Sequence, residues 1–170
     1  MLGWITAVIV VPVVAVVAFF AVGPQTVWRT LAGDPDTGRL ALADIARTGK
    51  PNDALLAPET ATPIPPDRVA PVFAVAAPVL FQTVIDRVEA QSSVTWAEKD
   101  PEGLYARAVT FSPTLRFPDV NHIWVVADGD ASASIAFYAA AQLGHSDLGK
   151  NRQRLETWLG LLDDVPKRAQ

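Results

Sequence analysis

The N-terminal part of the chain is uniformly apolar rather than patterned. From Trp4 to Gly23 it reads WITAVIVVPVVAVVAFFAVG, and residues 1 to 28 contain no ionisable side chain. About twenty residues in an α-helix extend roughly 30 Å, which is the thickness of the hydrocarbon core of a bilayer. The pattern therefore predicts a transmembrane anchor over residues 1–25, with a kink at Pro12 of the kind that membrane helices tolerate.

A cleaved signal peptide is the alternative for this segment. No Lys or Arg precedes the apolar run, and the run is longer than the usual apolar core of a signal peptide. Pro24 directly follows the small residues that a signal peptidase would need, while Trp4 and Trp28 flank the run as interfacial aromatic residues do. We therefore expect an uncleaved, single-pass anchor.

The next segment, residues 26–68, has no sustained periodicity. The sequence from Asp34 to Gly38 is typical of turns, and a group of prolines favours extended polyproline backbone. These prolines are Pro58, Pro63, Pro65 and Pro66. The composition predicts an irregular, proline-rich linker or strap.

Regular hydrophobic patterning begins at residue 69 and continues to residue 165. Apolar residues at helical spacing predict two helices, one from Pro78 and one around Leu155. Strands are predicted at residues 72–75, 94–96, 104–111, 120–127 and around 135–137. The order is strand, helix, four strands, helix, followed by a tail at residues 166–170. Short hairpin connections predict an α+β domain in which two helices pack on one face of an antiparallel sheet.

Charge and composition exclude several classes of protein and site. The 170 residues carry a formal net charge of −4 without a Lys/Arg cluster, so the chain has no electrostatic footprint for nucleic acid or for an anionic lipid surface. The absence of cysteine excludes disulfides, thiolate metal sites and a cysteine nucleophile.

Candidate catalytic residues are few. His122 lies in an alternating strand, where a histidine is more often structural, and His145 lies in the turn Gly144-His145-Ser146-Asp147. Consecutive residues cannot adopt the geometry of a catalytic triad, and no metal-ligand spacing or phosphate-binding glycine loop is present. We predict no catalytic residue, no metal site and no cofactor. A hydrolase that uses Asp119, His122 or His145 is the least favoured hypothesis.

Two motifs in the second half of the chain resemble those of a known family. Arg116-Phe117-Pro118-Asp119 precedes a hairpin, and the stretch from Gly144 to Arg152 reads GHSDLGKNR before a Leu/Trp-rich helix. Over residues 28 to 163 the pattern resembles membrane-anchored bacterial members of the domain-of-unknown-function 1499 family. The motif residues, which we interpret as structural, are Arg116, Phe117, Pro118, Asp119, Gly144, Ser146, Asp147, Gly149, Asn151 and Arg152.

The resemblance also bears on location. Four basic residues, Arg29, Arg39, Arg47 and Lys50, follow the anchor, and the positive-inside rule alone would place the domain in the cytoplasm. Members of the family are typically found outside the cytoplasm. The resemblance therefore implies a bacterial inner-membrane protein with a periplasmic C-terminal domain, and it implies no particular activity.

One departure from the family pattern predicts a contact surface. Where the family commonly has S-R-x-R, this chain has Ala139, Ala140, Ala141 and Gln142. Small apolar side chains on a strand let another backbone or helix approach closely, as at a docking surface, and they also suit ordinary core packing. The predicted partner contacts are these four residues together with Pro12, Phe19, Phe20 and Trp28.

The leading hypothesis is a non-catalytic accessory or interaction subunit of a larger integral-membrane complex, in contact with lipid through its anchor. The alternative is a periplasmic binding module for a small apolar or lipid-like ligand. In that case Trp96, Trp124 and Phe137 are expected to line the pocket.

Overall fold

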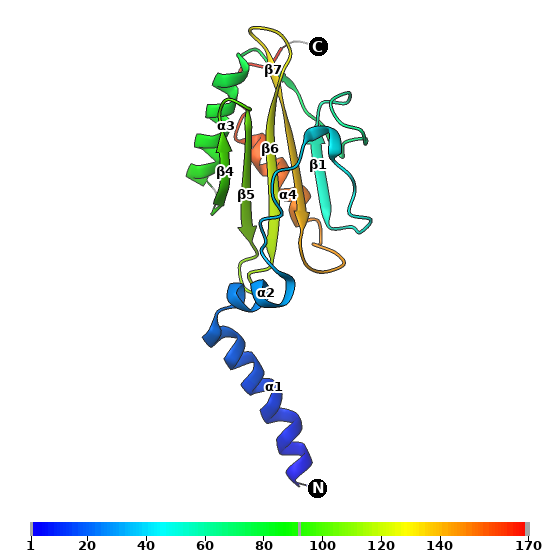
Figure 1. Ribbon diagram of the computed structural model, residues 1–170, viewed down its shortest axis with the longest axis vertical. Coiled ribbons are helices and arrows are strands. Elements are labelled where there is room, and N and C mark those ends of the chain that lie inside the picture. Colours follow the sequence, from blue (N-terminus) through cyan, green and yellow to red (C-terminus); the bar gives the residue numbers. More distant parts are fainter. Residues whose placement is uncertain (1, 92, 169–170) are drawn as a thin grey trace.

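The computed structural model of the chain describes residues 2–91 and 93–168 (Figure 1). The helices are α1 (Leu2–Val22), α2 (Pro24–Ala32), the short 3-10 helix η1 (Leu42–Asp44), α3 (Ala77–Gln91) and α4 (Lys150–Gly160). The strands are β1 (Asp53–Ala57), β2 (Arg68–Val69), β3 (Val72–Phe73), β4 (Thr95–Asp100), β5 (Tyr105–Phe111), β6 (Pro118–Ala127) and β7 (Ala133–Ala141). The side chain of Trp4, a predicted interfacial residue, lies outside the described residues, as does the end of the predicted tail.

The strands form one sheet in the order β2-β1-β7-β6-β5-β4, and β3 pairs with the first part of β7. All pairings are antiparallel except that of β1 with the two-residue β2. The long central strands β6 and β7 are joined by a tight hairpin, closed by a hydrogen bond from the amide of Asp128 to the carbonyl of Ser132. This hairpin forms the far end of the molecule from α1 (Figure 1).

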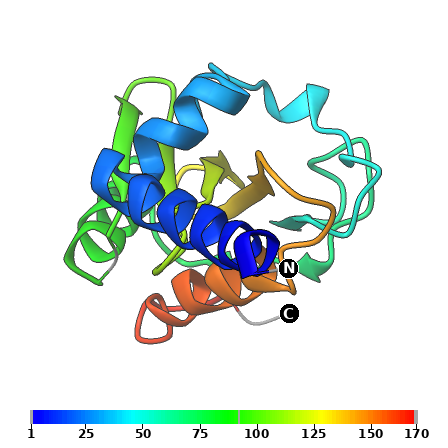
Figure 2. The same ribbon diagram turned by 90° about the horizontal axis from the view of Figure 1, so that it is seen from below.

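Helices α3 and α4 pack on one face of the sheet and enclose the main hydrophobic core. Apolar residues of α3 recur at helical spacing, so that Leu80, Val84 and Val88 are each 1 % exposed or less. From α4, Trp158 lies with its ring edge-on to Phe137 of β7, at a centroid distance of 5.9 Å. Seen from below, α3 and α4 lie on the same side of the sheet (Figure 2).

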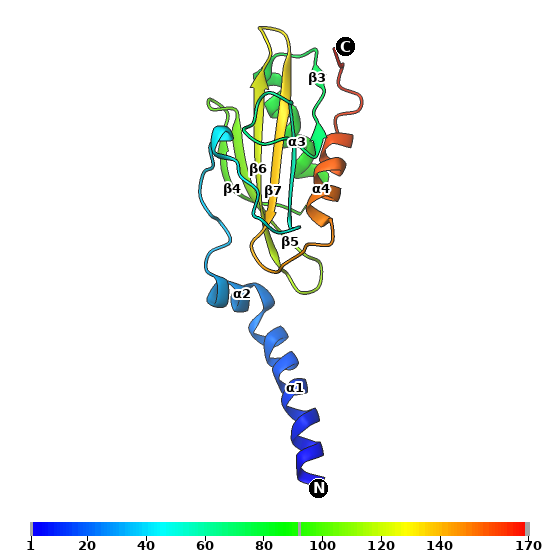
Figure 3. The ribbon, with the colours of Figure 1, turned by 90° about the vertical axis from the view of Figure 1, so that its right-hand side faces the viewer.

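The opposite face of the sheet is covered by residues 33–50, which we call the covering segment. This segment follows α2 and lies on the side of the sheet away from α4 (Figure 3). Ile45 is 2 % exposed and belongs to a second core with Leu55, Tyr105 and Trp124. The sheet is therefore buried on both faces, although only one of them is covered by α-helices.

The prediction of a mixed helix-and-strand domain with a mainly antiparallel sheet is confirmed. The segment predicted to be irregular, however, contains α2, β1 and β2. β1 is buried on both faces, so its sequence DALLA lacks the alternation that marks a half-buried strand. The strand predicted at residues 72–75 is shorter and ends at Phe73.

The two N-terminal helices are bent relative to each other by 96°. The bend lies at Gly23, whose φ of +95° favours glycine, and Pro24 then begins α2. By length and composition, no single helix within the described residues is sufficient to cross a membrane, whereas Val10–Val22 and Pro24–Ala32 together meet that requirement. The side chains of α1 from Val10 to Phe20 are mostly exposed, and the helix extends away from the sheet (Figure 1).

Ile45 tests whether the covering segment is part of the cooperative fold. Its replacement by Ala removes a buried side chain from the second core and should lower the free energy of unfolding by roughly 2–5 kcal/mol. Val79→Ala is a matched control, because Val79 is 58 % exposed on α3 and should change stability by less than about 0.5 kcal/mol. Chemical denaturation of the full chain in detergent measures both. Equal effects of the two substitutions would contradict the assignment.

Candidate functional site

The pleat of β6 sends the candidate residues to opposite faces of the sheet. Successive side chains of a strand point in opposite directions. Asp119 and Asn121 contact Arg154 of α4 on the helix face, whereas His122 contacts Tyr105 on the face under the covering segment. Asp119 and His122 therefore cannot act together on one substrate.

A network of ion pairs fastens the covering segment to β4 and β5. Arg107 of β5 bonds to Asp36 through Nε, at 2.5 Å from Oδ1, and through Nη2, at 3.1 Å from Oδ2. Its Nη1 also lies 2.7 Å from Oε2 of Glu98. The hydrogen bonds from Arg107 hold the pKa of Asp36 below its usual value, although partial burial opposes them. A half-buried chain turn is thus held against the strand by a bidentate arginine–carboxylate pair.

Arg39 of the covering segment forms a second bridge. Its Nη1 lies 2.7 Å from Oε1 of Glu98 and 2.8 Å from Oδ2 of Asp100. Its guanidinium also lies over the ring of Tyr105, with Cζ 4.4 Å from the ring centroid. This position combines charge pairing with a cation–π contact.

His122 lies beneath these ion pairs and is 2 % exposed. Its Nδ1 is 2.9 Å from the hydroxyl of Tyr105, and its ring stacks on Trp124 at a centroid distance of 5.5 Å. Burial, and then the charge of Arg107, lowers the pKa of His122 to about 4. The imidazole is therefore neutral at pH 7.

Tyr138 completes this aromatic group from β7. Its hydroxyl donates a hydrogen bond to the carbonyl of Ala46, 3.0 Å away, and so ties the end of the covering segment to the sheet. Burial, and then the charge of Asp53, raises the pKa of Tyr138 to about 12. The hydroxyl is thus protonated and acts as a donor.

A cavity of about 390 Å³ lies between the covering segment and the sheet. Its lining includes Leu40, Val120, His122, Tyr138 and Gln142. Ala140 and Ala141 also line the cavity, and their small side chains leave its volume unfilled beside the covering segment.

The family motif residues gather on the helix face, around Arg154. Its Nη2 lies 2.7 Å from Oδ2 of Asp119, and its Nη1 donates to the side-chain oxygens of Asn121 and Asn151. Burial raises the pKa of Asp119, and the neighbouring Arg154 opposes that shift. Nδ2 of Asn121 donates in turn to Oγ1 of Thr110 at 3.0 Å. These residues cross-link three elements: α4, β6 and β5.

The glycine-rich motif shapes the turn before α4 through backbone contacts. Asp147 accepts hydrogen bonds from the amides of Gly149, at 2.9 Å, and Asn151, at 2.7 Å. Such a carboxylate satisfies amides at the start of a helix that have no partner within it. Nδ2 of Asn151 reaches the carbonyl of Asn52, whose own Nδ2 donates to the carbonyl of Gly144. Gly144 and Gly149 have φ of +90° and +75°, as the turn requires.

Of the remaining motif residues, Pro118 is buried at the start of β6, and the others lie nearer the surface. Ser146 accepts a hydrogen bond from the amide of Leu148, and Arg152 is exposed on α4. The guanidinium of Arg116 lies 4.9 Å from the ring centroid of Phe111. Phe117 stacks on Trp28 of α2 at 4.8 Å.

The prediction of an exposed docking surface at the alanine stretch is wrong for Ala139 and Ala140, which are 0 % and 8 % exposed. They pair with β6 on one side and, unexpectedly, with β1 on the other. The missed strand β1 is the physical reason, since it occupies the edge of β7 that was assumed to be free. Nε2 of Gln142 donates to the carbonyls of Ala32 and Asp34.

The aromatic trio predicted to line one pocket is divided between the two faces. Phe137 and Trp96 belong to the core under the helices, and Trp124 belongs to the core under the covering segment. They therefore cannot line a single cavity. The cavity residues that sequence reasoning missed are Tyr138 and Gln142, and the ion-paired Arg107 beside His122 was missed as well. The sequence did contain a signal for Arg107, which is a charged residue in the otherwise apolar strand 104–111. A buried charge of this kind needs an ion-pair partner from another element.

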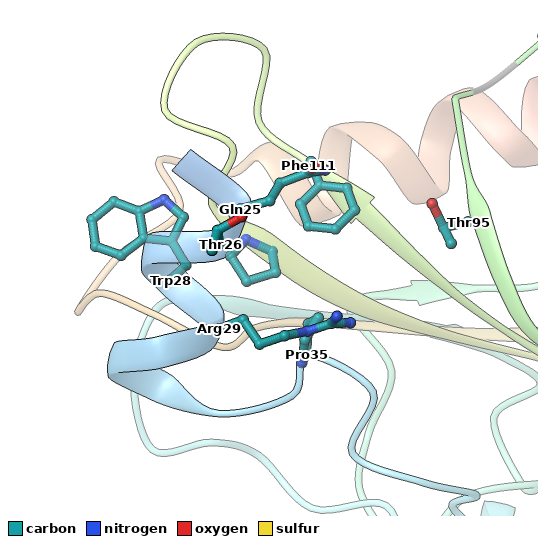
Figure 4. Close-up of a pocket in the computed structure, with 8 residues that line it drawn as sticks. Gln25, Thr26, Trp28, Arg29, Pro35, Thr95 and Phe111 are labelled. Atoms are coloured by element: carbon teal, nitrogen blue, oxygen red, sulfur yellow. The ribbon is translucent and has the colours of Figure 1, made fainter. Parts of the chain in front are cut away.

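Trp28 connects α1, α2 and the domain. Its ring lies 5.4 Å from that of Phe19, and its Nε1 donates to the carbonyl of Leu115 at 2.5 Å. A second cavity, of about 360 Å³, lies beside it. Figure 4 shows side chains from α2, from Pro35 of the covering segment and from Phe111 at the end of β5 gathered around this cavity. In the part of the chain that the structure describes, no group of three or more His, Asp or Glu residues is placed to hold a metal ion.

His122→Phe should change the pH dependence of stability. The imidazole has a pKa of about 4 in the folded chain against 6.5 when unperturbed, so the unfolded chain binds more protons between these values. The folded chain should lose roughly 3 kcal/mol as the pH falls from 6.5 to 4, and the variant should lack this loss. Denaturation at each pH measures the free energy of unfolding of the parent chain and of the variant. Both proteins contain the same carboxylates, so the contributions of these groups cancel in the difference. Parallel curves would contradict a neutral, buried His122.

Arg154→Met should leave the carboxylate of Asp119 buried without a counter-charge. We expect a loss of about 3–5 kcal/mol at pH 7, partly recovered as the pH is lowered and Asp119 takes up a proton. The double variant Asp119→Asn, Arg154→Met should be more stable than the sum of the single changes. Arg87→Met is the control, since Arg87 pairs with Asp164, whose side chain is 73 % exposed, and should lose less than about 1 kcal/mol. Additive single and double effects would contradict the coupling.

The comparisons with known proteins bear on the same residues. A family model described as a protein of unknown function (DUF1499) matches residues 43–162, a range that spans the whole sheet, both motifs and both packed helices. Among curated proteins, none matches the chain. Because the match covers more than half of the 170 residues, the chain belongs to the DUF1499 family.

Proposed function

We propose that this protein is a non-catalytic, single-pass membrane protein whose domain is an accessory or interaction subunit of a larger membrane complex. In this proposal α1 is embedded in a bacterial inner membrane, and the domain lies in the periplasm. The observation that carries the proposal is an exposed apolar helix fastened to a folded domain through Trp28.

The exposed side chains of α1 support the membrane assignment. Val11, Val13, Val14 and Val17 are between 56 % and 65 % exposed, and the helix carries no charged side chain. An apolar surface of this kind requires a cover of lipid or protein. The phenylalanine pair Phe19 and Phe20 lies at the end of the helix nearest to the domain, with ring centroids 5.2 Å apart.

The bend after α1 supports a fixed attachment rather than a flexible tether. α2 turns away from α1 by 96°, and Trp28 contacts both α1 and the loop before β6. Tryptophan is enriched at the membrane–water interface, where its ring is covered and its N–H finds a polar partner. Such an attachment presents the domain to neighbours in one orientation.

The chemistry of the domain supports a non-catalytic role. Arg39 and Arg107 are neutralised by carboxylates of the covering segment and of β4, and Asp119 is neutralised by Arg154. His122 and Asp119 lie on opposite faces of the sheet. These groups contribute to the fold, and Asp119 and His122 do not form a pair with each other.

Purification of the full chain from native membranes in a mild detergent tests the proposal. We expect extraction only with detergent and one stoichiometric partner that spans the membrane. The double variant Phe19→Leu, Phe20→Leu keeps the helix apolar but removes both rings, and it should remain in the membrane while losing at least half of the partner. Val14→Leu, Val17→Leu is the matched control and should retain the partner. Extraction without detergent, or a full-length chain that runs alone, would contradict the proposal.

A further inference from the structure

The cavity beneath the covering segment has the dimensions of a ligand site. Its volume of about 390 Å³ lies within the range of roughly 300–1,000 Å³ typical of small-molecule pockets. The sheet contributes Val120, Tyr138 and Ala140 to its lining, and the covering segment contributes Thr37 and Leu40. Most of the exposed surface of the lining is apolar, and polar side chains such as Thr48, His122 and Gln142 are interspersed in it, as in a site that recognises an apolar molecule with a few polar groups.

The charges around the cavity are already paired. Arg39, which lines it, bridges Glu98 and Asp100, and the neighbouring Arg107 pairs with Asp36 and Glu98. Together these groups carry two positive and three negative charges, so no excess positive charge is left to receive an anion. Burying a charge without a partner is costly, so an anion is disfavoured here, and an uncharged ligand needs no partner charge.

The hydrogen bonds of Tyr105 favour one tautomer of His122. A guanidinium only donates, and Nη1 of Arg107 lies 3.5 Å from the hydroxyl oxygen of Tyr105. A hydroxyl that accepts from Arg107 can donate its own proton to Nδ1 of His122, 2.9 Å away. In this arrangement the proton of the neutral imidazole resides on Nε2. Among the described residues Nε2 has no hydrogen-bond partner, although His122 is 2 % exposed and lines the cavity.

We propose that the cavity beneath the covering segment binds a small, uncharged, mainly apolar molecule whose ester or amide carbonyl accepts a hydrogen bond from Nε2 of His122. Gln142, which also lines the cavity, donates through Nε2 to the carbonyls of Ala32 and Asp34 and so holds the start of the covering segment beside the site. The site is independent of the accessory role proposed above.

Two neutral ester probes distinguish the possible sources of such a ligand. Monooctanoylglycerol is added to the bilayer of nanodiscs that hold the full chain, and triacetin is added to the surrounding water. The readout is the side-chain ¹⁵N–¹H spectrum of histidine, in which His145 is an internal control because the chain has only two histidines. A shift of the Nε2–H signal of His122 with the first probe assigns a lipid ligand, and a shift with the second assigns a dissolved one. If neither probe moves this signal, the proposal is overturned.

Matched variants locate the binding. Ala140→Leu should fill the cavity and abolish the shift, while His122→Phe keeps an aromatic ring but removes the donor and should weaken binding about 3- to 10-fold, measured by titration with thermal unfolding. Octanoate, an anionic counterpart of the first probe, should bind at least tenfold more weakly. Unchanged affinity in His122→Phe would overturn the proposal even if Ala140→Leu fails to fold, and so would tighter binding of octanoate. Val79→Ala should bind as the parent chain does.

Discussion

The pairing of Arg107 with Asp36 and Glu98 determines how one half of the structure is arranged. Arg107 lies on a strand in which every residue from Tyr105 to Thr110 is buried, and its side chain is 8 % exposed. A guanidinium cannot be left there without counter-charges, because desolvation would cost more than the sheet could recover. Asp36 must therefore approach the sheet, and the rest of the covering segment follows it. Burial chiefly lowers the pKa of His122, and the positive charge of Arg107 adds to that shift while Asp36 opposes it.

The helix-covered half of the sheet could be predicted from the sequence, whereas the other half could not. Leu80, Val84 and Val88 recur at helical spacing on α3, and the hairpin turn before β7 contains the turn residues Asp128 and Gly129. These signals are local. β1 gives no such signal, because a strand buried on both faces resembles any short apolar run. Its partner strand is also more than seventy residues distant in the sequence.

The candidate site shows the same division between local and long-range information. The motif around Asp147 is readable because a carboxylate near a helix start has a local task, and Asp147 does bond to amides there. The cavity depends instead on Asp36 and Arg107, which are 71 residues apart. Its existence also requires small side chains at positions 140 and 141, which were interpreted as a surface because the neighbouring strand was not recognised.

The long β6–β7 hairpin extends away from α1 and ends at the opposite pole of the molecule (Figure 1). β6 has ten residues, and at about 3.3 Å per residue it extends roughly 33 Å. In a chain anchored through α1, the length of this hairpin sets the height at which its acidic tip, with Asp128 and Asp130, stands above the bilayer surface. The sheet then holds the tip at a fixed distance from the bilayer. Only a neighbouring membrane protein that extends to a similar height could contact that tip.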